Sequence, residues 1–376
     1  MSRVDPRAGD TGFPVRSLCL VSPFPPPFGG MAVQADKLAH ALEADGVTVE
    51  RVRTNPLDAA PRGFIARVPY VRTLASLALF LRDLHRALGR TEAVYFLTSF
   101  VNFFFWVTLP AMILIRLHGK PLVLSARGGG ARAFFNRHGP LVRLSMRLAD
   151  RISTPSAFLR DVFRDTLGLE TVIVPNIADV EQFTYIEREH FRPRFLVTRK
   201  LEPIYGVDGV IRAFAVINAR CPEAVLSVVG AGSQMEMLGQ LARELGLADS
   251  VRFLGQVDHQ GIQEVYARHD VLLNASSVDN LPGAILEAFA SGVPVVSTAA
   301  GGIPYLVQDG QNGLLVPVGD WQGLAEAALR VVREPELGAR LARAGLMTTR
   351  QFSWAEIEPI LKDMLSAMCR EKACPA

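Results

Sequence analysis

Two acidic side chains, Asp279 and Glu287, have the spacing and the setting for binding chemistry. Asp279 precedes a predicted helix, and Glu287 lies about two turns along it, on a face that can look back toward the strand ends. The start of a helix presents free backbone N–H groups and a partial positive charge, so it can hold a phosphate while the carboxylates hold hydroxyl groups. The alternative is an acid that favours the helix dipole and a solvated glutamate.

The elements that must position these acids follow from the stretch Asp270 to Gly302. An apolar run, Val271 to Leu273, predicts a buried strand, and a polar loop comes after it. The helix is predicted to end at Ser291-Gly292, before a second strand from Val293 to Ser297. A strand–loop–helix–strand unit is typical of a parallel α/β sheet, which binds ligands at the carboxyl ends of its strands.

Two predicted strands in the first half of the chain also end in residues suited to binding. Val15 to Val21 leads to Gly29-Gly30, which open a helix and allow a ligand close to the backbone. Leu122 to Ser125 delivers Arg127 and then Gly128-Gly129-Gly130, where an arginine fork suits a phosphate or a carboxylate. The alternatives are an ordinary glycine-containing α/β turn at Gly29-Gly30 and a flexible linker with a solvated arginine at Arg127.

A further strand in the second half, Arg194 to Thr198, is followed by Arg199 and Lys200. Two cations at a strand end can neutralise a diphosphate. Two exposed, solvated cations are the alternative.

The stretch around the two acids resembles the donor-site signature of retaining glycosyltransferases of family 4, the glycosyl transferases group 1, which have the GT-B fold. The family pattern is an acid, seven residues and Glu-Ala, then a small residue with Gly-x-Pro-Val-Val, and finally a glycine pair. Aspartate stands at 279 where the family usually has glutamate, and Tyr205 stands where a lysine usually precedes the glycine. The matching residues are Asp279, Glu287-Ala288, Ser291-Gly292-Val293-Pro294-Val295-Val296 and Gly301-Gly302.

The resemblance implies an α/β protein with the GT-B fold, in which two Rossmann-like domains with doubly wound parallel sheets face a cleft. We expect residues 1–185 to form the N-terminal, acceptor-side domain and residues 194–349 the nucleotide-sugar-binding domain. Residues 350–376 are expected to form a helix that returns to the N-terminal domain.

The resemblance also implies a function: a retaining glycosyltransferase that moves a sugar from a nucleotide sugar to a glycan or lipid-linked acceptor, in cell-surface polysaccharide or glycolipid biosynthesis. Arg199, with Lys200, would stabilise the leaving diphosphate. Asp279 would hold the transferred sugar, and Glu287 would hold the ribose. Further donor-binding residues would be Gly29, Gly30, Gln256, Val257, Asn280, Leu281, Pro282 and Gly283, with backbone N–H groups at Leu281 to Gly283 cradling the diphosphate. The acceptor would meet Arg127, Gly128, Gly129 and Gly130.

Neither a metal nor another cofactor is expected, because no Asp-x-Asp motif occurs and the cations can serve the diphosphate. Two alternatives share this fold. One is a catalytically silent protein that binds sugar nucleotides, and the other is a nucleotide-sugar epimerase.

The charge of the chain is unevenly distributed. The net charge is +3, but residues 1–190 hold 23 Lys/Arg against 17 Asp/Glu, and the remainder holds 17 against 20. No acidic residue occurs between Glu92 and Asp150. A basic face suits an anionic membrane or an anionic acceptor, or it is simply solvated; no nucleic-acid partner is predicted. The basic residues of that segment are Arg116, Lys120, Arg127, Arg132, Arg137, Arg143 and Arg147.

An uncharged segment, Ala93 to Ile115, is long enough to raise the alternative of a membrane span. We prefer a strand at Ala93 to Leu97 followed by a helix at Phe100 to Leu117, because polar residues interrupt the run and Pro110 would kink it. The Phe/Trp cluster beside a basic stretch predicts interfacial contact with a membrane.

The expected location is the cytoplasm, with peripheral contact to the cytoplasmic face of a membrane. Four cysteines are few for 376 residues, and they show no metal-binding spacing. The first twelve residues lack the apolar core of a signal peptide.

Overall fold

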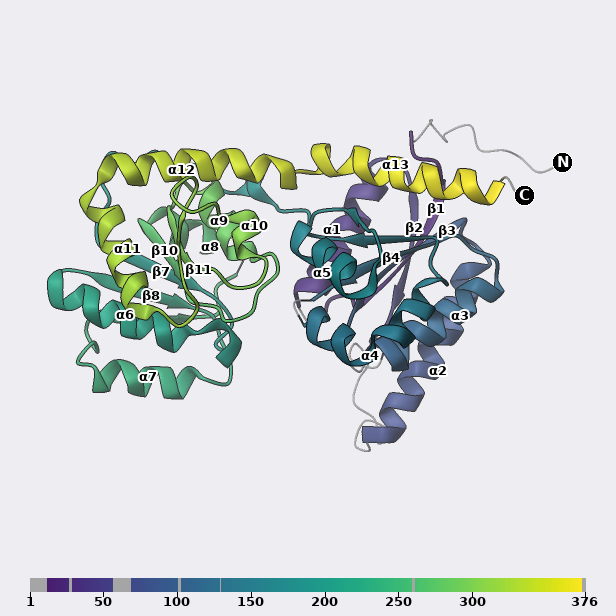
Figure 1. Cartoon of the computed structure of the whole chain (residues 1–376), viewed down its shortest axis with the longest axis horizontal. Coiled ribbons are helices and arrows are strands. Elements are labelled where there is room, and N and C mark those ends of the chain that lie inside the picture. Colours follow the sequence, from purple (N-terminus) through teal and green to yellow (C-terminus); the bar gives the residue numbers. More distant parts are fainter. Residues whose placement is uncertain are drawn as a thin grey trace. The chain divides into compact units, whose positions relative to one another are not determined.

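The computed structural model describes residues 12–26, 29–56, 69–100, 103–128, 130–258 and 261–373. The chain forms two compact units, called here unit 1 (Met1–Ile177 with Trp354–Ala376) and unit 2 (Ala178–Ser353) (Figure 1). The C-terminal helix therefore belongs to unit 1. The predicted domain limits, 1–185, 194–349 and 350–376, differ from these divisions by four to sixteen residues.

Unit 1 is built on six parallel strands with helices on both faces. Its strands are β1 (Ser17–Ser22), β2 (Thr48–Arg53), β3 (Ala93–Ser99), β4 (Leu122–Arg127), β5 (Arg151–Thr154) and β6 (Val172–Ile173). Its helices are α1 (Gly30–Ala44), α2 (Pro69–Leu88), the π-helical turn η3 (Phe104–Thr108), α3 (Leu109–Leu117), α4 (Ala131–Met146), α5 (Ala157–Leu167) and α13 (Trp354–Ala373). The strand order is β2-β1-β3-β4-β5-β6.

Strand side chains of unit 1 alternate between two apolar layers. Val94 and Phe96 of β3 pack under α2, α3, α4 and α5, whereas Tyr95 and Leu97 face α1 and α13. Both faces of the sheet are covered, as is usual for a parallel sheet.

Unit 2 repeats this architecture. Its strands are β7 (Arg194–Thr198), β8 (Val225–Val229), β9 (Val251–Gly255), β10 (Val271–Asn274), β11 (Val295–Thr298) and β12 (Leu314–Val316), in the order β12-β11-β10-β7-β8-β9. Its helices are α6 (Val207–Arg220), α7 (Met235–Glu244), α8 (Gly261–Ala267), α9 (Gly283–Ala290), α10 (Ile303–Leu306), α11 (Trp321–Arg333) and α12 (Pro335–Thr349). Short 3-10 turns lie at η4 (Val180–Gln182), η5 (Pro203–Tyr205) and η6 (Arg350–Phe352).

The strand order of unit 2 fixes where its loops gather. β7 comes first in the chain and lies in the middle of the sheet, with β8 and β9 on one side and β10 to β12 on the other. All neighbouring strands are parallel, so their carboxyl ends share one edge. In doubly wound sheets, ligands bind at that edge where the winding changes direction. Here the change lies between β7 and β10, which are followed by Arg199 and by the loop 275–282.

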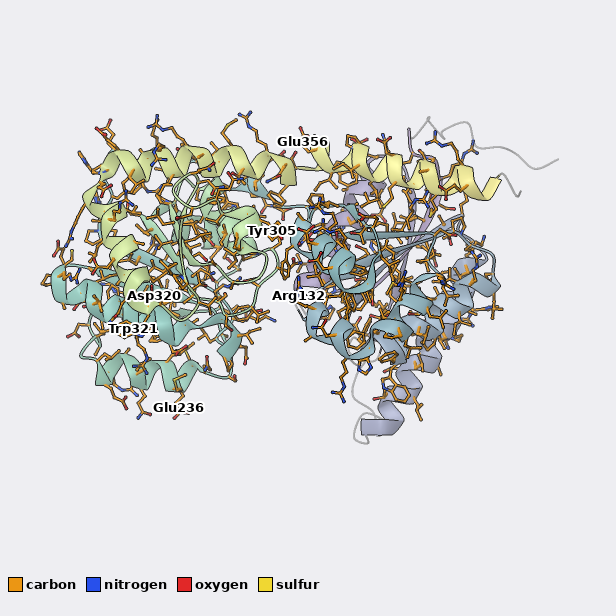
Figure 2. All side chains as sticks on the ribbon, in the orientation of Figure 1. Arg132, Glu236, Tyr305, Asp320, Trp321 and Glu356 are labelled. Atoms are coloured by element: carbon orange, nitrogen blue, oxygen red, sulfur yellow. The ribbon has the colours of Figure 1, made fainter. Side chains whose placement is uncertain are left out.

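Local signals explain where several helices begin. The Ser156 hydroxyl accepts a hydrogen bond from the Leu159 N–H at 3.3 Å and caps α5. Asp320, labelled in Figure 2, does the same for α11 through the Gly323 N–H at 2.8 Å. Such caps satisfy backbone donors that have no partner inside the helix.

The helix that follows β4 is longer than the sequence indicated. The apolar pattern after Gly139-Pro140 predicts a helix over Leu141 to Leu148, but α4 begins at Ala131, directly after Gly130. Gly139-Pro140, normally a helix-ending pair, lies inside α4. Buried side chains at Phe135 and Val142 hold both halves of the helix against the sheet, and this packing outweighs the local proline signal.

The uncharged segment Ala93 to Ile115 is a strand followed by a helix, which confirms the preferred interpretation. β3 supplies the strand, and η3 with α3 supplies the helical part. Among the described residues, no helix is long and apolar enough to cross a membrane.

Candidate functional site

The glycine pair Gly301-Gly302 holds the loop after β10 in place. A Cβ atom on Gly301 would collide with the carbonyl oxygen of Asp279, and one on Gly302 with that of Asn280. The Gly302 N–H also donates to the Asp279 carbonyl at 2.9 Å. Because only glycine permits such close backbone approach, the pair fixes Asp279 at the sheet edge.

Arg199 is the central cation of this edge. Its guanidinium forms an ion pair with Asp279, its Nη2 donates to the Ser276 hydroxyl at 3.1 Å, and it lies 4.6 Å from the centre of the Tyr205 ring. The side chains of Arg199 and Asp279 are only 11% and 13% exposed. Burial lowers the pKa of Arg199, but a guanidinium is so basic that it stays charged. Its Nε atom has no hydrogen-bond partner among the residues that the structure describes.

Tyr205 gives a physical reason for one departure from the family pattern. The residue before Gly206 is aromatic instead of cationic, and its ring lies against the Arg199 guanidinium. A cation over a tyrosine face is attracted by about 0.5–2 kcal/mol. Tyr205 therefore helps to hold Arg199 in place rather than adding a second positive charge.

Asp279 is engaged on both carboxylate oxygens. Oδ1 accepts from the Asn280 N–H at 2.9 Å, and Oδ2 pairs with Arg199. Two residues predicted to bind different parts of a donor, Arg199 and Asp279, are thus brought into direct contact with each other.

Glu287 lies on the inner side of α9 and is held by Tyr266. The Tyr266 hydroxyl is 2.9 Å from Glu287 Oε2 and 2.7 Å from Thr198 Oγ1, and 3.1 Å from the Ala284 carbonyl. Tyr266 is fully buried. Burial first, and the Glu287 carboxylate second, raise the pKa of Tyr266 well above its usual value, so the hydroxyl keeps its proton. A phenol has one hydrogen, which Tyr266 can donate to the carboxylate while accepting from Thr198.

Sequence reasoning missed Tyr266. It lies on α8, outside every motif, and a tyrosine on an apolar helix face is ordinary core composition. Only the fold brings it between Thr198 at the end of β7 and Glu287 on α9.

The start of α9 differs in detail from the predicted cradle. Pro282 is the N-cap of α9, and Gly283 is its first residue. Proline has no N–H, and it cannot contribute the donor that the cradle at Leu281 to Gly283 assumed. The exposed Gly283 and its neighbour Ala284 carry the first helix-start N–H groups.

Three further predicted donor residues of unit 2 follow β7 and β9. Lys200 is exposed beside Arg199. Gln256 and Val257 follow β9, which is separated from β7 by β8; Gln256 is exposed, and Val257 packs on the apolar layer around α9.

The predicted residues of unit 1 follow two strands of its sheet. Gly29 caps α1, and Gly30 is its first residue, after β1. Arg127 ends β4 and donates to Ser125 Oγ at 3.2 Å and to the Asn176 side chain. Gly128 has a positive φ of 103°, Gly130 caps α4, and Gly129 lies outside the described residues.

No group of three or more His, Cys, Asp or Glu side chains able to hold a metal occurs within the described ranges.

Two family models match adjoining parts of the chain. Residues 28–182 match Glycosyltransferase Family 4, and residues 183–346 match Glycosyl transferases group 1. The chain belongs to this glycosyltransferase family. The resemblance inferred from the motif around Asp279 and Glu287 is thereby confirmed.

Two similar curated proteins come from bacteria. D-inositol 3-phosphate glycosyltransferase of Saccharomonospora viridis is 36% identical over 174 residues, which are 44% of this chain and 40% of that protein. The lipopolysaccharide core biosynthesis glycosyltransferase LpsE of Rhizobium meliloti is 37% identical over 150 residues, 40% of this chain and 44% of that protein. The matched part thus spans less than half the length of each relative.

Among solved structures, Alr3699/HepE of Anabaena in complex with UDP and glucose superposes with a TM-score of 0.70. It covers 94% of this chain and 100% of the HepE chain at 20% sequence identity. At this identity the likeness concerns the fold alone, and with the two parallel sheets it confirms the predicted GT-B fold.

Proposed function

We propose that this family member transfers a sugar from a nucleoside diphosphate sugar to a hydroxyl group of a glycan or lipid-linked acceptor, with retention of anomeric configuration. The observation that carries this proposal is the convergence of Arg199, Asp279 and Glu287 with the start of α9 at the winding reversal of unit 2. A diphosphate needs a fixed cation and the N–H groups at the start of a helix, and sugar hydroxyls need carboxylates as hydrogen-bond acceptors.

Arg199 is proposed to bind the donor diphosphate and to stabilise it as it leaves. Its guanidinium is held by Ser276 and Tyr205, so its position changes little when charge develops on the phosphate oxygen. Fixed charges and dipoles of this kind lower the barrier because they need no reorganisation. The N–H groups at Gly283 and Ala284 would add to this binding.

The proposed reaction breaks the bond between the sugar C1 and the diphosphate oxygen, which leaves with the bonding electrons. The acceptor hydroxyl oxygen forms the new bond to C1 on the same face of the sugar. Its proton passes to the departing phosphate oxygen, so no separate histidine base is needed. The positive charge of Arg199 can serve the leaving group without a metal.

Asp279 is proposed to change partners when the donor binds. A diphosphate that binds the Arg199 guanidinium would compete with the carboxylate that now pairs with it. Asp279 is then available for the hydroxyl groups of the transferred sugar and for the positive charge that develops at C1.

Glu287 is proposed to accept hydrogen bonds from the ribose hydroxyls. The Tyr266 hydroxyl donates to Glu287 Oε2 and fixes the orientation of the carboxylate toward the sheet edge.

The acceptor is proposed to belong to cell-surface polysaccharide or glycolipid biosynthesis, with Arg127 and the glycines of 128–130 on the acceptor side. The named activities of the relatives support this, since one acts in lipopolysaccharide core biosynthesis. Work at the cytoplasmic face of a membrane is part of the same proposal.

The test is transfer of labelled sugar by the purified protein. UDP-glucose is the first donor to try, because HepE was solved with UDP and glucose, followed by other nucleoside diphosphate sugars with lipid-linked and soluble glycan acceptors. We expect release of the nucleoside diphosphate that depends on acceptor, and a product with the donor's anomeric configuration. Binding of the donor without turnover would identify a catalytically silent binding protein. Conversion of the sugar without an acceptor would identify an epimerase. A product of inverted anomeric configuration would contradict retention.

A further inference from the structure

Large apolar side chains are exposed together on α3 and α4 of unit 1. Trp106 in η3 is 62% exposed and Leu117 at the end of α3 is 80% exposed, with Ile113 between them. Leu141 and Leu144 of α4 are also at least half exposed. Single exposed apolar residues are common, but a group of five on adjoining elements indicates a contact surface.

The two helices run side by side, so these residues form one surface. At one end, the ring centre of Phe105 in η3 lies 5.4 Å from that of Phe134 in α4. At the other end, Arg116 of α3 pairs with Asp150, just beyond α4, at 3.5 Å. Figure 1 draws both helices on the same face of the sheet. This surface of α3 and α4 is called the α3–α4 face below.

Helical spacing places the exposed residues on the outer side of each helix. Ile113 and Leu117 are four residues apart, whereas Met112 and Ile115 point into the core. On α4, Arg137, Leu141 and Leu144 recur at intervals of four and three.

The charged side chains that η3, α3 and α4 themselves contribute to the α3–α4 face are all basic. Arg116 pairs with Asp150 and Arg132, labelled in Figure 2, pairs with Asp165, so these two cations are neutralised. Arg137, Arg143 and Arg147 are exposed and form no ion pair with any described residue. No acidic residue occurs in the sequence from 93 to 149. A ligand for this surface must therefore be apolar and anionic together.

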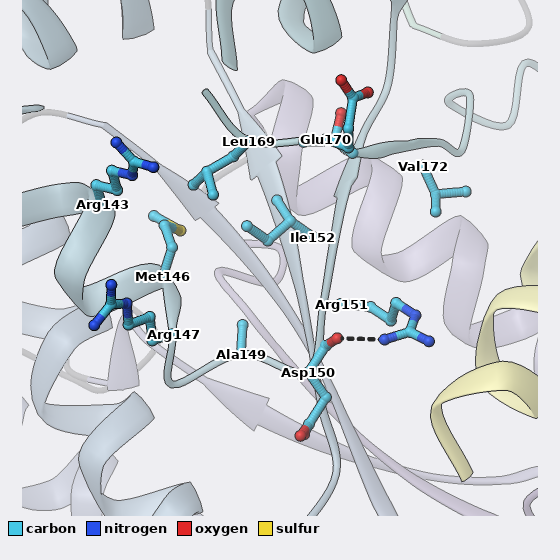
Figure 3. A pocket seen from close by; sticks show the side chains of 11 residues that line it. Arg143, Met146, Arg147, Ala149, Asp150, Arg151, Ile152, Leu169, Glu170 and Val172 are labelled. Carbon is cyan, nitrogen blue, oxygen red and sulfur yellow. Dashed lines mark hydrogen bonds between the residues drawn. The ribbon is translucent and has the colours of Figure 1, made fainter. Parts of the chain in front are cut away.

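A hollow lies at the end of α4, beside these arginines. It has a volume of about 510 Å³ and is lined by Arg143, Met146 and Arg147, by the segment 149–152 and by the segment 169–172, and it includes the acids Asp150 and Glu170. Figure 3 shows Arg143 and Arg147 on the same wall, with their guanidinium groups apart from Asp150 and Glu170. The hollow is wide enough for a phosphate-bearing headgroup beside the apolar stripe.

We propose that the α3–α4 face docks onto the surface of an anionic lipid bilayer. Trp106, Ile113, Leu117, Leu141 and Leu144 would enter the boundary between headgroups and acyl chains, where aromatic and aliphatic side chains above a basic surface are favoured. Arg137, Arg143 and Arg147 would contact lipid phosphates, and each cation near an anionic leaflet adds to the attraction. A bilayer fits better than a free phosphate, because a free phosphate leaves the apolar side chains in water. This inference rests on unit 1 and does not depend on the transferase activity.

The test is co-sedimentation with vesicles, using three double or triple variants. Ile113→Ser with Leu117→Ser removes apolar contact, and Arg137→Gln with Arg143→Gln and Arg147→Gln removes charge. The matched control is Met237→Ser with Leu245→Ser, which alters exposed apolar residues around α7 in unit 2, beside the acidic Glu236 and Glu244. Thermal melting verifies that each variant is folded.

We expect the wild type to bind phosphatidylcholine vesicles that contain about 30% of the anionic lipid phosphatidylglycerol. It should not bind vesicles of phosphatidylcholine alone. Each α3–α4 variant should bind at least about tenfold more weakly, with the control unchanged. High salt should weaken binding, and inorganic phosphate at equal ionic strength should not compete more than chloride does. Absence of binding to anionic vesicles, or equal binding by wild type and variants, would overturn the inference. Specific competition by phosphate would indicate a soluble anion instead.

Quenching of tryptophan fluorescence is a second measurement, and it tests whether the α3–α4 face itself contacts the lipid. Trp106 is one of three tryptophans, and brominated acyl chains quench tryptophans that enter the boundary region. Quenching should fall in Trp106→Phe, which keeps an aromatic side chain. Quenching that is unchanged in this variant would contradict the docking orientation.

Discussion

The carboxyl edges of the two sheets use glycine in opposite ways. In unit 2, Cβ atoms on Gly301 and Gly302 would strike the backbone of Asp279 and Asn280. In unit 1, Cβ atoms on Gly29, Gly30 and Gly130 would meet nothing within 4 Å. The unit 2 glycines are needed to pack one loop on another, whereas the unit 1 glycines leave the backbone open. The first arrangement suits a fixed partner, such as a donor common to a family, and the second suits a partner that varies.

The polar groups at the two edges differ in the same sense. In unit 2, Arg199 pairs with Asp279, and Glu287 is bonded through Tyr266 to Thr198. The cation of this edge is thus held by a carboxylate, whereas neutral side chains hold the cation of the unit 1 edge. In unit 1, Arg127 bonds to Ser125 and Asn176, which lie on its own strand and on the segment after β6. The predictions below test whether the carboxyl edge of the unit 2 sheet is the more rigidly held of the two and whether it carries the chemistry.

The largest effect is expected from Glu287→Ala, which removes the carboxylate proposed to hold the ribose. Transfer should fall at least about tenfold, because the loss of a charged hydrogen-bond acceptor costs about 1.5–3 kcal/mol. The measurement is kcat/KM with the sugar donor that the transfer assay identifies. The matched control is Glu264→Ala, an exposed acid of the same unit that pairs with Arg268 on the surface. Equal activity of the Glu287 variant and the control would show that Glu287 has no role in the reaction.

The glycine contrast predicts opposite changes in stability. Gly302→Ala should lower the free energy of unfolding by about 1–3 kcal/mol, because its methyl group has to displace the Asn280 backbone. Gly30→Ala, at the first residue of α1 with open space around it, should be neutral or raise that energy by about 0.5–1 kcal/mol. Denaturant unfolding measures both. Similar destabilisation by the two variants would abolish the distinction between the edges.

Tyr266→Phe should produce a smaller effect on donor binding. The ring remains, but Glu287 and Thr198 lose the hydroxyl between them. If Tyr266 only fills the core, the fold should lose stability without a change in nucleotide selectivity. If it orients Glu287, the variant should also lose part of its preference for ribonucleoside over 2′-deoxyribonucleoside diphosphates, by about three- to tenfold, which corresponds to about 0.6–1.4 kcal/mol. Calorimetric titration of both ligands checks this, and an unchanged preference would leave Tyr266 without a positioning role.

The smallest effect is expected from alkaline titration. The pKa of Tyr266 is raised in the folded protein, so folding favours its protonated form. The associated stability is fully present below the ordinary tyrosine pKa of about 10 and is lost as the pH rises above it. Wild type should therefore lose more thermal stability between about pH 9 and 11 than Tyr266→Phe does. Parallel losses in the two proteins would show that Tyr266 does not carry this dependence.

Much of the carboxyl edge of unit 2 could be predicted from the sequence, because its motif is local. The acids at 279 and 287, the glycine pair and the strands around them lie within one stretch of chain, and local spacing determines which element each belongs to. Tyr266 and the partner of Arg199 depend on the strand order of the whole sheet, and no local pattern contains that information. The early start of α4 was missed because packing of Phe135 and Val142 overrides the proline signal within the helix.

The measurement that tests the central claim most directly is calorimetric binding of UDP and uridine to the wild type and to Arg199→Ala. If Arg199 holds the diphosphate, the variant should bind UDP at least about tenfold more weakly, a loss of about 1.4 kcal/mol or more in binding free energy. Its affinity for uridine should stay within about twofold of the wild-type value, a difference of about 0.4 kcal/mol. Equal weakening of both ligands, or UDP affinity that does not change, would contradict a diphosphate site at the edge formed by β7 and β10.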